Sequence, residues 1–323
     1  MLCIYLVYYL NLEISLISRF EQRFSQGAWP YLLMIGGAFI ISTNHVLGRY
    51  VGGEIPPMGL AFWRVTIGAI ILLPFAWNDI FRQRFIILNN WKLLFVMAIA
   101  FMPLGNAMVY LGYNFTTAIN GGIIATAQPA TTVLLAWLIL RQKINLTQFF
   151  GVGTAAIGVL IIITKGNPLG LATITFNNGD LLLLIGITAF SFYSVMLRQV
   201  PSSISPMLIL VVIQIMGAIS LLPFYIYESL TYKTVPLNIE ALMVLAWIGV
   251  VIAVIAVGMT NMSVLALGPA KASIGHYLRA VFTAGMAIII LGETMELYHL
   301  ISVGIVIIGV IFMSRGQSPT QRS

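Results

Sequence analysis

The sequence predicts an all-α membrane protein of ten transmembrane helices, arranged as two inverted five-helix repeats. Composition, an internal repeat and the distribution of basic residues carry this prediction. Of the 323 residues, 60% are hydrophobic and only 8% are charged, and the mean hydropathy is +1.00. A soluble domain carries about 25% charged residues, so this composition indicates a chain that resides in a bilayer.

Apolar segments of about 20 residues recur along the chain, and each is long enough to span a bilayer as a helix. A membrane β-barrel would instead show stretches of roughly ten residues with alternating polarity, which this sequence lacks. Pro103 and Pro129 fall within spans, where each is expected to kink its helix. We expect spans at about 30–50, 57–77, 92–112, 118–140, 144–164, 179–199, 206–227, 239–260, 269–291 and 297–314.

The chain repeats itself at a separation of 149 residues. Residues 37–75 align without a gap on 186–224 and share 15 identities. The pairing of Arg49 with Arg198 carries the most weight, because arginine is scarce in this chain. The later part of each half matches at a separation of 151 residues. Five spans per copy is an odd number, so two tandem copies must cross the membrane in opposite directions.

The repeat divides the chain into five parts. We expect the first five-helix repeat at 28–164 and the second at 179–314, with a linker at 165–178 that glycine and proline punctuate. Residues 1–27 lack the features of a removable signal, and we expect a cytoplasmic or interfacial extension there. Residues 315–323 form the expected cytoplasmic tail.

The basic residues orient the chain in the membrane. If both termini are cytoplasmic, the inside segments hold 11 of the 16 basic residues and the outside segments hold 3. This asymmetry follows the positive-inside rule. The net charge of +7 is therefore a signal of topology and does not indicate a nucleic-acid partner.

Short motifs accompany the apolar spans. The first half carries Gly48-Arg49, Pro56-Pro57 and the run Leu60–Arg64, and the second carries Leu291-Gly292-Glu293. Together they resemble bacterial EamA-type proteins of the drug/metabolite transporter superfamily. The resemblance covers about residues 30–314, although Arg141-Gln142 replaces the family's Gly-Glu and Ala280 replaces a proline expected opposite Pro129.

The resemblance implies two EamA repeats in a bacterial inner membrane, with a central cavity and alternating access. It also implies transport of small metabolites, often the export of amino acids or their analogues. Uptake of a nucleotide-like or cofactor-like metabolite is the alternative within transport. An integral membrane enzyme or lipid-handling protein is the alternative of another class.

Two arginines fall in the middle of predicted spans. Arg64 lies in span two and Arg279 in span nine, whereas all nine acidic residues fall in tails, loops or helix ends. Charged groups inside a membrane are costly and mark candidate sites. Two guanidinium groups without a carboxylate partner suit a substrate carboxylate or phosphate. Bonding to helix-end carbonyls or snorkelling to an interface is the alternative.

The absence of acidic residues from the middle of the predicted spans also bears on energy coupling. Small multidrug antiporters of the superfamily exchange protons for cationic drugs on an embedded glutamate, so the sequence disfavours that activity. Histidine remains as a proton carrier, and proton coupling stays open. His276 lies one helical turn before Arg279, on the same face, while His45 and His299 are weaker candidates.

Neutral polar residues complete the predicted site. Gln128 corresponds to Arg279 in the repeat and Asn44 corresponds to Tyr193, so these pairs should approach one central axis from opposite sides. Interhelical hydrogen bonding is the alternative role for such residues. The predicted substrate-binding residues are Asn44, Arg64, Tyr110, Gln128, Tyr193, Gln214, His276 and Arg279.

Catalytic and metal chemistry find no support in the sequence. It contains a single cysteine, no metal-ligand spacing, no nucleophile elbow and no phosphate-binding loop. We therefore expect a secondary carrier with no cofactor, rather than an enzyme. Its expected partners are a small-molecule substrate and membrane lipid, and we expect a monomer or weak homodimer.

Overall fold

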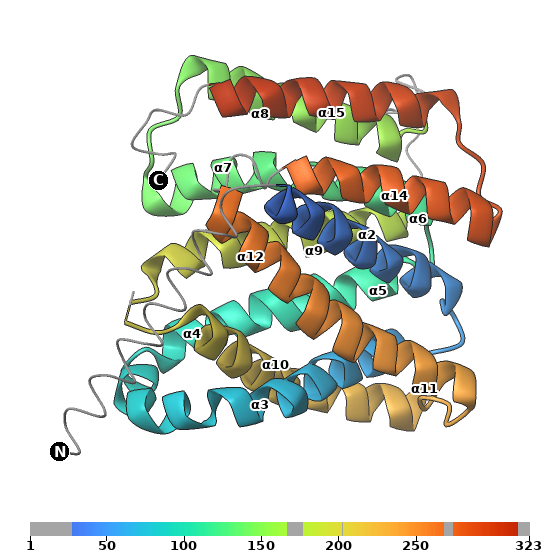
Figure 1. Ribbon diagram of the computed structural model, residues 1–323. Helices are drawn as coiled ribbons and strands as arrows, with labels where there is room; N and C mark the ends of the chain where they lie inside the picture. Colours follow the sequence, from blue (N-terminus) through green and yellow to red (C-terminus); the bar gives the residue numbers. More distant parts are fainter. Residues whose placement is uncertain (1–27, 167–176, 202, 268–273, 316–323) are drawn as a thin grey trace.

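The computed structural model describes residues 28–166, 177–201, 203–267 and 274–315, and its regular elements are all helical (Figure 1). The expected N-terminal extension, most of the expected linker and the expected tail after Arg315 lie outside these residues. The helices stack in layers, with α8 (Leu146–Ile163) and α15 (Leu297–Arg315) on one side and α3 (Pro57–Asn89) on the other.

The helices of the described chain follow the order expected from the apolar segments. The first half contains α2 (Trp29–Tyr50), α3, α4 (Trp91–Ile99), the π-helix η1 (Ala100–Ala107), α5 (Met108–Gly112), α6 (Ala118–Ala125), α7 (Gln128–Leu140) and α8. The second contains α9 (Asn178–Met196), the 3₁₀ turn η3 (Leu197–Gln199), α10 (Pro206–Thr231), α11 (Ile239–Ala246), the π-helix η4 (Trp247–Ala256), α12 (Val257–Leu267), α14 (Ile274–Leu291) and α15.

Among the described residues, seven helical stretches are long and apolar enough to cross a membrane. The pair α6 and α7 makes an eighth if it counts as one span, and it bends by 43°. Two further apolar helices, Gly275–Leu291 and Leu297–Phe312, are shorter. Each expected span thus has a helical counterpart, and ten crossings stays a prediction.

The two prolines inside spans have different local effects. Pro129 is at the start of α7, directly after the bend, as its missing N–H predicts. Pro103 lies inside η1, where the helix widens and continues. A third proline, Pro74, sits within α3, which runs past the expected end at residue 77 to Asn89.

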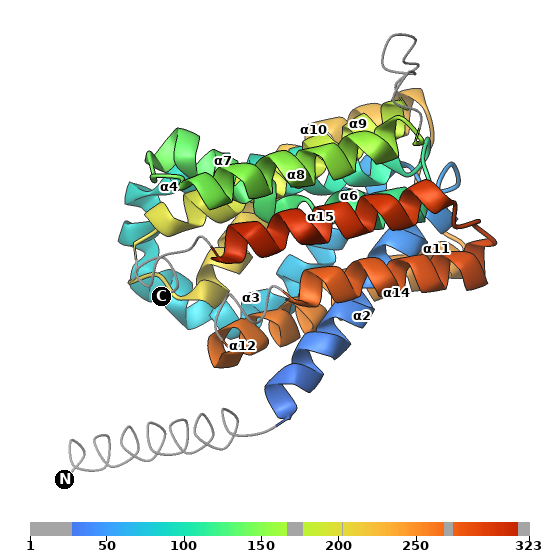
Figure 2. The ribbon, with the colours of Figure 1, turned by 90° about the horizontal axis from the view of Figure 1, so that it is seen from above.

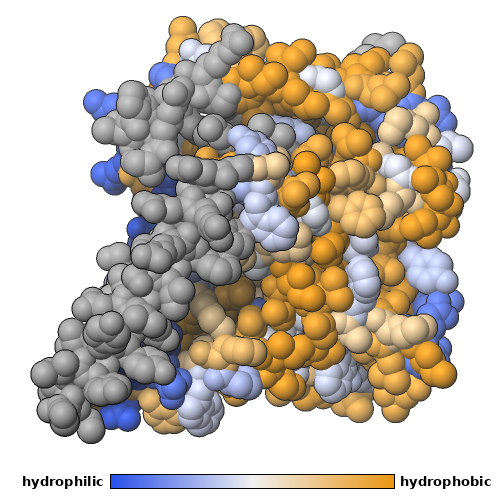
Figure 3. Space-filling view, viewed as in Figure 1, coloured by the Kyte–Doolittle hydropathy of each residue, from blue (hydrophilic) through white to orange (hydrophobic). Residues whose placement is uncertain are grey.

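The outer surface is apolar around the middle of the molecule. The face visible in Figure 3 is mostly hydrophobic, and its hydrophilic residues gather along two opposite edges. Helices such as α3, α14 and α15 run between these edges (Figure 1). A protein that exposes its middle to lipid and its two ends to water has this distribution.

Helices α8 and α15 pack closely through small residues, and Figure 2 shows them side by side. A methyl group added at Gly158 would lie 3.0 Å from the carbonyl oxygen of Ser302, and one added at Gly309 would lie 2.6 Å from that of Gly151. The Ser302 hydroxyl donates to the Gly158 carbonyl at 2.5 Å. Small residues let helix backbones approach in this way.

This packing predicts that the loss of stability caused by a large side chain depends on its position along α15. Gly309→Leu should destabilise the purified protein by about 1–3 kcal/mol, because the side chain would overlap the backbone of α8. Gly304→Leu is the matched control, since a methyl group there would meet nothing within 4 Å. Thermal unfolding in detergent measures both, and an equal loss in the two variants would contradict the proposed packing.

Candidate functional site

A cavity of about 670 Å³ lies between the two halves of the chain. Residues of α2, α3, η1, α6, α7, α9, α10, η4, α12 and α14 line it. The polar lining residues are Asn44, His45, Arg64, Asn106, Gln128, Tyr193, Ser194, Thr260, His276 and Arg279. They include two arginines and two histidines but no carboxylate, so the described lining carries net positive charge.

Arg64 is held by neutral partners. Its guanidinium donates to the Asn106 Oδ1 and, at 3.1 Å, to the Tyr110 hydroxyl. Tyr110 in turn donates to the Asn44 Oδ1 at 2.6 Å. The Asn106 amide donates to the Phe101 carbonyl at 2.7 Å, five residues back in the π-helix η1. The chain of bonds orients the guanidinium without neutralising its charge.

Arg279 faces the cavity from α14, and its Nε is buried without a hydrogen-bond partner in the described part of the chain. The Ser42 hydroxyl donates to its backbone carbonyl at 3.0 Å, which ties this turn of α14 to α2. His276 lies one turn earlier and also lines the cavity. A buried donor without a partner costs free energy, so this guanidinium has bonding capacity that a bound anion could use.

The break between α6 and α7 faces the same cavity. Gly122 and Ala125 line it from α6, and Gln128 lines it from the first turn of α7. The Gln128 carbonyl accepts a hydrogen bond from the Ser191 hydroxyl of α9 at 3.1 Å. The break thereby brings an amide side chain and a helix start to the cavity wall.

Aromatic rings form an apolar part of the wall. Phe101 of η1 lies 5.2 Å from Phe190 and 4.5 Å from Tyr193 between ring centroids, and all three rings line the cavity. The cavity therefore combines cationic groups, amides and an aromatic surface, which suits a small solute with both charged and apolar parts.

The cavity extends toward the connection between α9 and α10, where Leu197, Val200, Pro201, Ile204 and Pro206 line it. Hydrogen-bonded polar groups occupy the opposite end of the molecule. We call these two ends the α10 end and the α3 end, after the helix that begins at each. The cavity lining thus reaches the α10 end, and a polar network lies beyond it at the α3 end.

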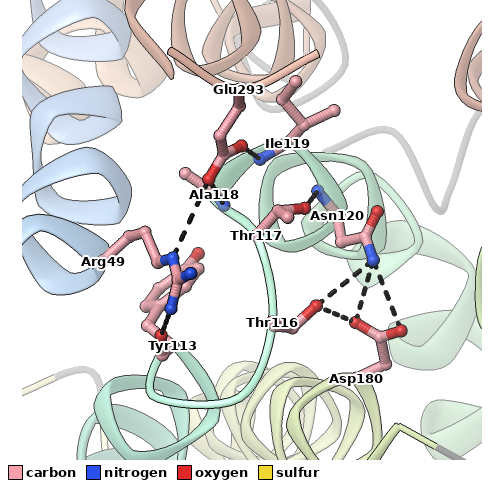
Figure 4. Close-up of polar contacts among 9 residues, drawn as sticks. All are labelled: Arg49, Tyr113, Thr116, Thr117, Ala118, Ile119, Asn120, Asp180 and Glu293. Atoms are coloured by element: carbon pink, nitrogen blue, oxygen red, sulfur yellow. Dashed lines mark hydrogen bonds and ion pairs between the residues drawn. The ribbon is translucent and has the colours of Figure 1, made fainter. Parts of the chain in front are cut away.

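Glu293 is the centre of the network at the α3 end (Figure 4). Its carboxylate accepts from the backbone N–H groups of Ala118 at 2.8 Å and Ile119 at 3.0 Å, which start α6. Its Oε1 lies 4.0 Å from the Nε of Arg49. Arg49 also donates to the Tyr113 carbonyl at 2.9 Å. The network joins α2, α6 and the end of α14.

Asp180 forms a second, fully buried part of this end (Figure 4). It accepts from the Thr116 hydroxyl at 2.5 Å and from the Asn120 amide at 3.2 Å. His299 accepts the Glu296 N–H on Nδ1 at 2.9 Å, so its Nε2 carries the proton that faces the Asn120 Oδ1 at 3.0 Å. Asp180 is thus a buried acid at a helix end, bonded to α6.

The structure brings six of the eight predicted site residues to one cavity: Asn44, Arg64, Gln128, Tyr193, His276 and Arg279. Tyr110 is buried one hydrogen bond away. Gln214 is not among the lining residues. It is buried between α10 and α3, beside Gly68, and its Oε1 has no partner.

Three side chains with a clear place in the structure, Asn106, His45 and Glu293, are not among the predicted substrate-binding residues. Asn106 and His45 line the cavity, and the π-helical turn that orients Asn106 has no signal in the sequence pattern. Glu293 belongs to the motif Leu291-Gly292-Glu293, but this motif does not predict that Glu293 caps a helix. Its position directly after an apolar span was the available signal.

Comparisons with known proteins agree with this architecture. The EamA-like transporter family matches residues 28–164 and 177–315. An uncharacterized transporter of Bacillus subtilis, YyaM, is 24% identical over 88% of this chain and 93% of its own length. The WAT1-related protein At4g08290 of Arabidopsis thaliana is 28% identical over 54% of each chain. One solved crystal structure is similar in fold, with a TM-score of 0.55 at 15% identity over 88% of this chain and 96% of that chain.

The cap on α6 predicts a stability effect at the α3 end. Glu293→Gln should destabilise the protein by about 1–2 kcal/mol, because a neutral amide accepts the two N–H groups less strongly and loses the attraction to the helix dipole. Glu296→Gln, three residues away, is the control, because its carboxylate does not cap α6. Thermal unfolding in detergent compares them, and an unchanged midpoint for Glu293→Gln would reject the cap.

Proposed function

The chain belongs to the EamA-like transporter family, and from that membership we propose that it is a secondary carrier that exports an amino acid or a related anion-bearing metabolite by alternating access. It is a membrane transporter and not an enzyme. The observation that supports the substrate class is the lining of the cavity, which holds two arginines and no carboxylate among its described residues.

A substrate carboxylate would compensate the charge of this lining. Removing a cation from water is costly unless an opposite charge or several hydrogen bonds replace the water. Among the described residues, Arg64 has neutral partners only, and the Nε of Arg279 has none. An anion between them would accept charge-assisted hydrogen bonds, which are roughly twice as strong as neutral ones.

The rest of the cavity supports an amino acid in particular. Amide oxygens of the Asn44 and Gln128 side chains and the Tyr193 hydroxyl can accept from a substrate ammonium group. The aromatic wall around Phe101 offers contact to an apolar side chain. A nucleotide-like solute would use the same cations, so it belongs in the same experiment.

Reciprocal contacts support two inverted repeats. A methyl group at Gly37 would lie 3.4 Å from the carbonyl oxygen of Ala256, and one at Gly186 would lie 2.9 Å from that of Gly105. Gly186 follows Gly37 by 149 residues, and Ala256 follows Gly105 by 151. A pseudo-two-fold axis produces such matched pairs, and in inverted-repeat carriers the substrate site lies at the repeat interface.

The loop charges give the proposed orientation. They assign the α10 end to the cytoplasm, together with both termini. The cavity lining reaches this end, which supports the proposal of an inward-facing carrier that can take up a cytoplasmic solute. Closure of the α10 end and opening of the α3 end would then complete export. Whether protons drive this step stays open.

Flux into proteoliposomes tests the function. We expect saturable transport of one or more amino acids and no lipid turnover, with nucleotides as the competing substrates and an imposed pH gradient as the test of proton coupling. Arg279→Gln should reduce apparent affinity or turnover about 10-fold to 100-fold, because a charge-assisted hydrogen bond contributes about 1.5–3 kcal/mol.

Arg84→Gln is the matched control for this experiment. Arg84 lies near the end of α3, over the ring of Phe85, and does not line the cavity. Arg84→Gln should unfold at the midpoint of the unmodified protein, and Arg279→Gln should unfold at the same midpoint or a higher one, because it removes a buried charge that lacks a counter-ion. Normal kinetics in Arg279→Gln would reject its role in binding, and lipid turnover without flux of any solute would overturn the carrier.

A further inference from the structure

A carboxylate of α10 caps the start of α3. The two oxygens of Glu228 accept from the backbone N–H groups of Met58 at 3.2 Å and Gly59 at 2.8 Å. Pro56, which precedes the helix, contributes no side-chain cap. Helix starts leave N–H groups without intrahelical partners and carry partial positive charge. Glu228 therefore joins the end of α10 to the start of α3, at the α3 end.

The repeat contains a counterpart for every member of this contact. Subtracting 149 from Glu228 gives Asp79, and adding 149 to Met58 and Gly59 gives Met207 and Leu208. Asp79 lies in α3, and Met207 and Leu208 start α10. The repeat thus assigns a second acid, Asp79 of α3, to the start of a second helix, α10, at the α10 end.

The counterpart contact is not made in this structure. Asp79 is half-buried and has no hydrogen bond or ion pair with any residue in the described part of the chain. The Leu208 N–H donates instead to the Ser205 hydroxyl of its own helix, at a long 3.3 Å. The described cavity lining reaches this helix start through Ile204, Pro206 and Leu210, so the unmade contact lies at the end of the molecule that the lining reaches.

We propose that Asp79 is a positioning residue that closes the α10 end of the cavity by capping α10, while the Glu228 cap on α3 is released. The inference rests on the inverted repeat of the proposed function. In the closed form, the Asp79 carboxylate accepts from the N–H groups of Met207 and Leu208 and replaces the weak Ser205 bond. The two caps are alternatives, so their relative strength sets which end of the cavity is open.

Thiol accessibility tests this inference without any substrate. Cys3 is replaced by serine, and Leu210→Cys supplies one reporter thiol in the cavity lining near the start of α10. Purified protein is labelled with a hydrophilic maleimide in detergent. Glu228→Gln should slow labelling about fivefold to tenfold, because weakening the cap on α3 shifts the population toward closure of the α10 end.

The decisive variant combines both changes. Asp79→Asn should not slow labelling by itself, and in the Glu228→Gln background it should restore the fast rate, because both caps are then weakened. Asp79→Glu keeps the charge and should leave the Glu228→Gln rate slow. Glu54→Gln removes a carboxylate at the α3 end that does not contact the start of α3, and it should have no effect.

Each contrary outcome would overturn a specific part of the proposal. An unchanged rate in Glu228→Gln would reject the alternative caps, and a double variant as slow as Glu228→Gln would reject Asp79. Size-exclusion profiles and unfolding midpoints identify any variant that fails to fold, and Asp79→Glu then provides the second test of the charge. Because labelling needs no solute, failed flux would reject the proposed substrate and leave this result intact.

Discussion

Backbone N–H groups at the start of a helix need hydrogen-bond partners, and at α3 and α6 carboxylates from distant parts of the chain supply them. Lipid offers no hydrogen bonds, so a helix start that faces protein interior is satisfied by protein or left at a cost. Glu293 meets this need for α6, and Glu228 meets it for α3. Each carboxylate also fixes two helices to each other at the same end of the molecule. The described cavity lining does not include residues at these caps, and it reaches the end where the corresponding acid, Asp79, has no hydrogen bond or ion pair among the described residues.

The described acidic residues and the two cavity arginines thus lie in different parts of the protein. The described carboxylates lie away from the described cavity lining, where Glu228 and Glu293 cap helices, and the cavity holds the cations. A carboxylate beside Arg64 or Arg279 would neutralise the guanidinium internally and compete with a bound anion. The neutral partners of Arg64 avoid that competition while they hold its geometry. A buried charge that lacks an internal counter-ion is costly for folding, and the proposed substrate anion would offset that cost.

Much of this organisation could be predicted from the sequence, and the reasons are physical. Apolar segment length predicts helices, and the missing N–H of Pro129 predicts the break before α7. Mid-span polarity led to six residues that share a cavity. Gln214 shows where that reasoning stops, because periodicity alone cannot tell a residue that faces a cavity from one that faces a glycine of the next helix. The carboxylate caps could not be predicted from the sequence either, because the contact between Glu228 and the start of α3 joins residues 170 positions apart.

One difference between the two halves lies at Pro129 and its counterpart in the repeat. Pro129 lacks an N–H and the helix breaks ahead of it, whereas its counterpart Ala280 keeps the N–H and α14 runs unbroken from Ile274 to Leu291. The broken copy presents Gln128 at a helix start, and the intact copy presents Arg279 from the side of a helix. Related positions therefore offer an amide on one wall and a cation on the other. The two related positions therefore differ in charge, which two copies with the same residue at this position could not provide.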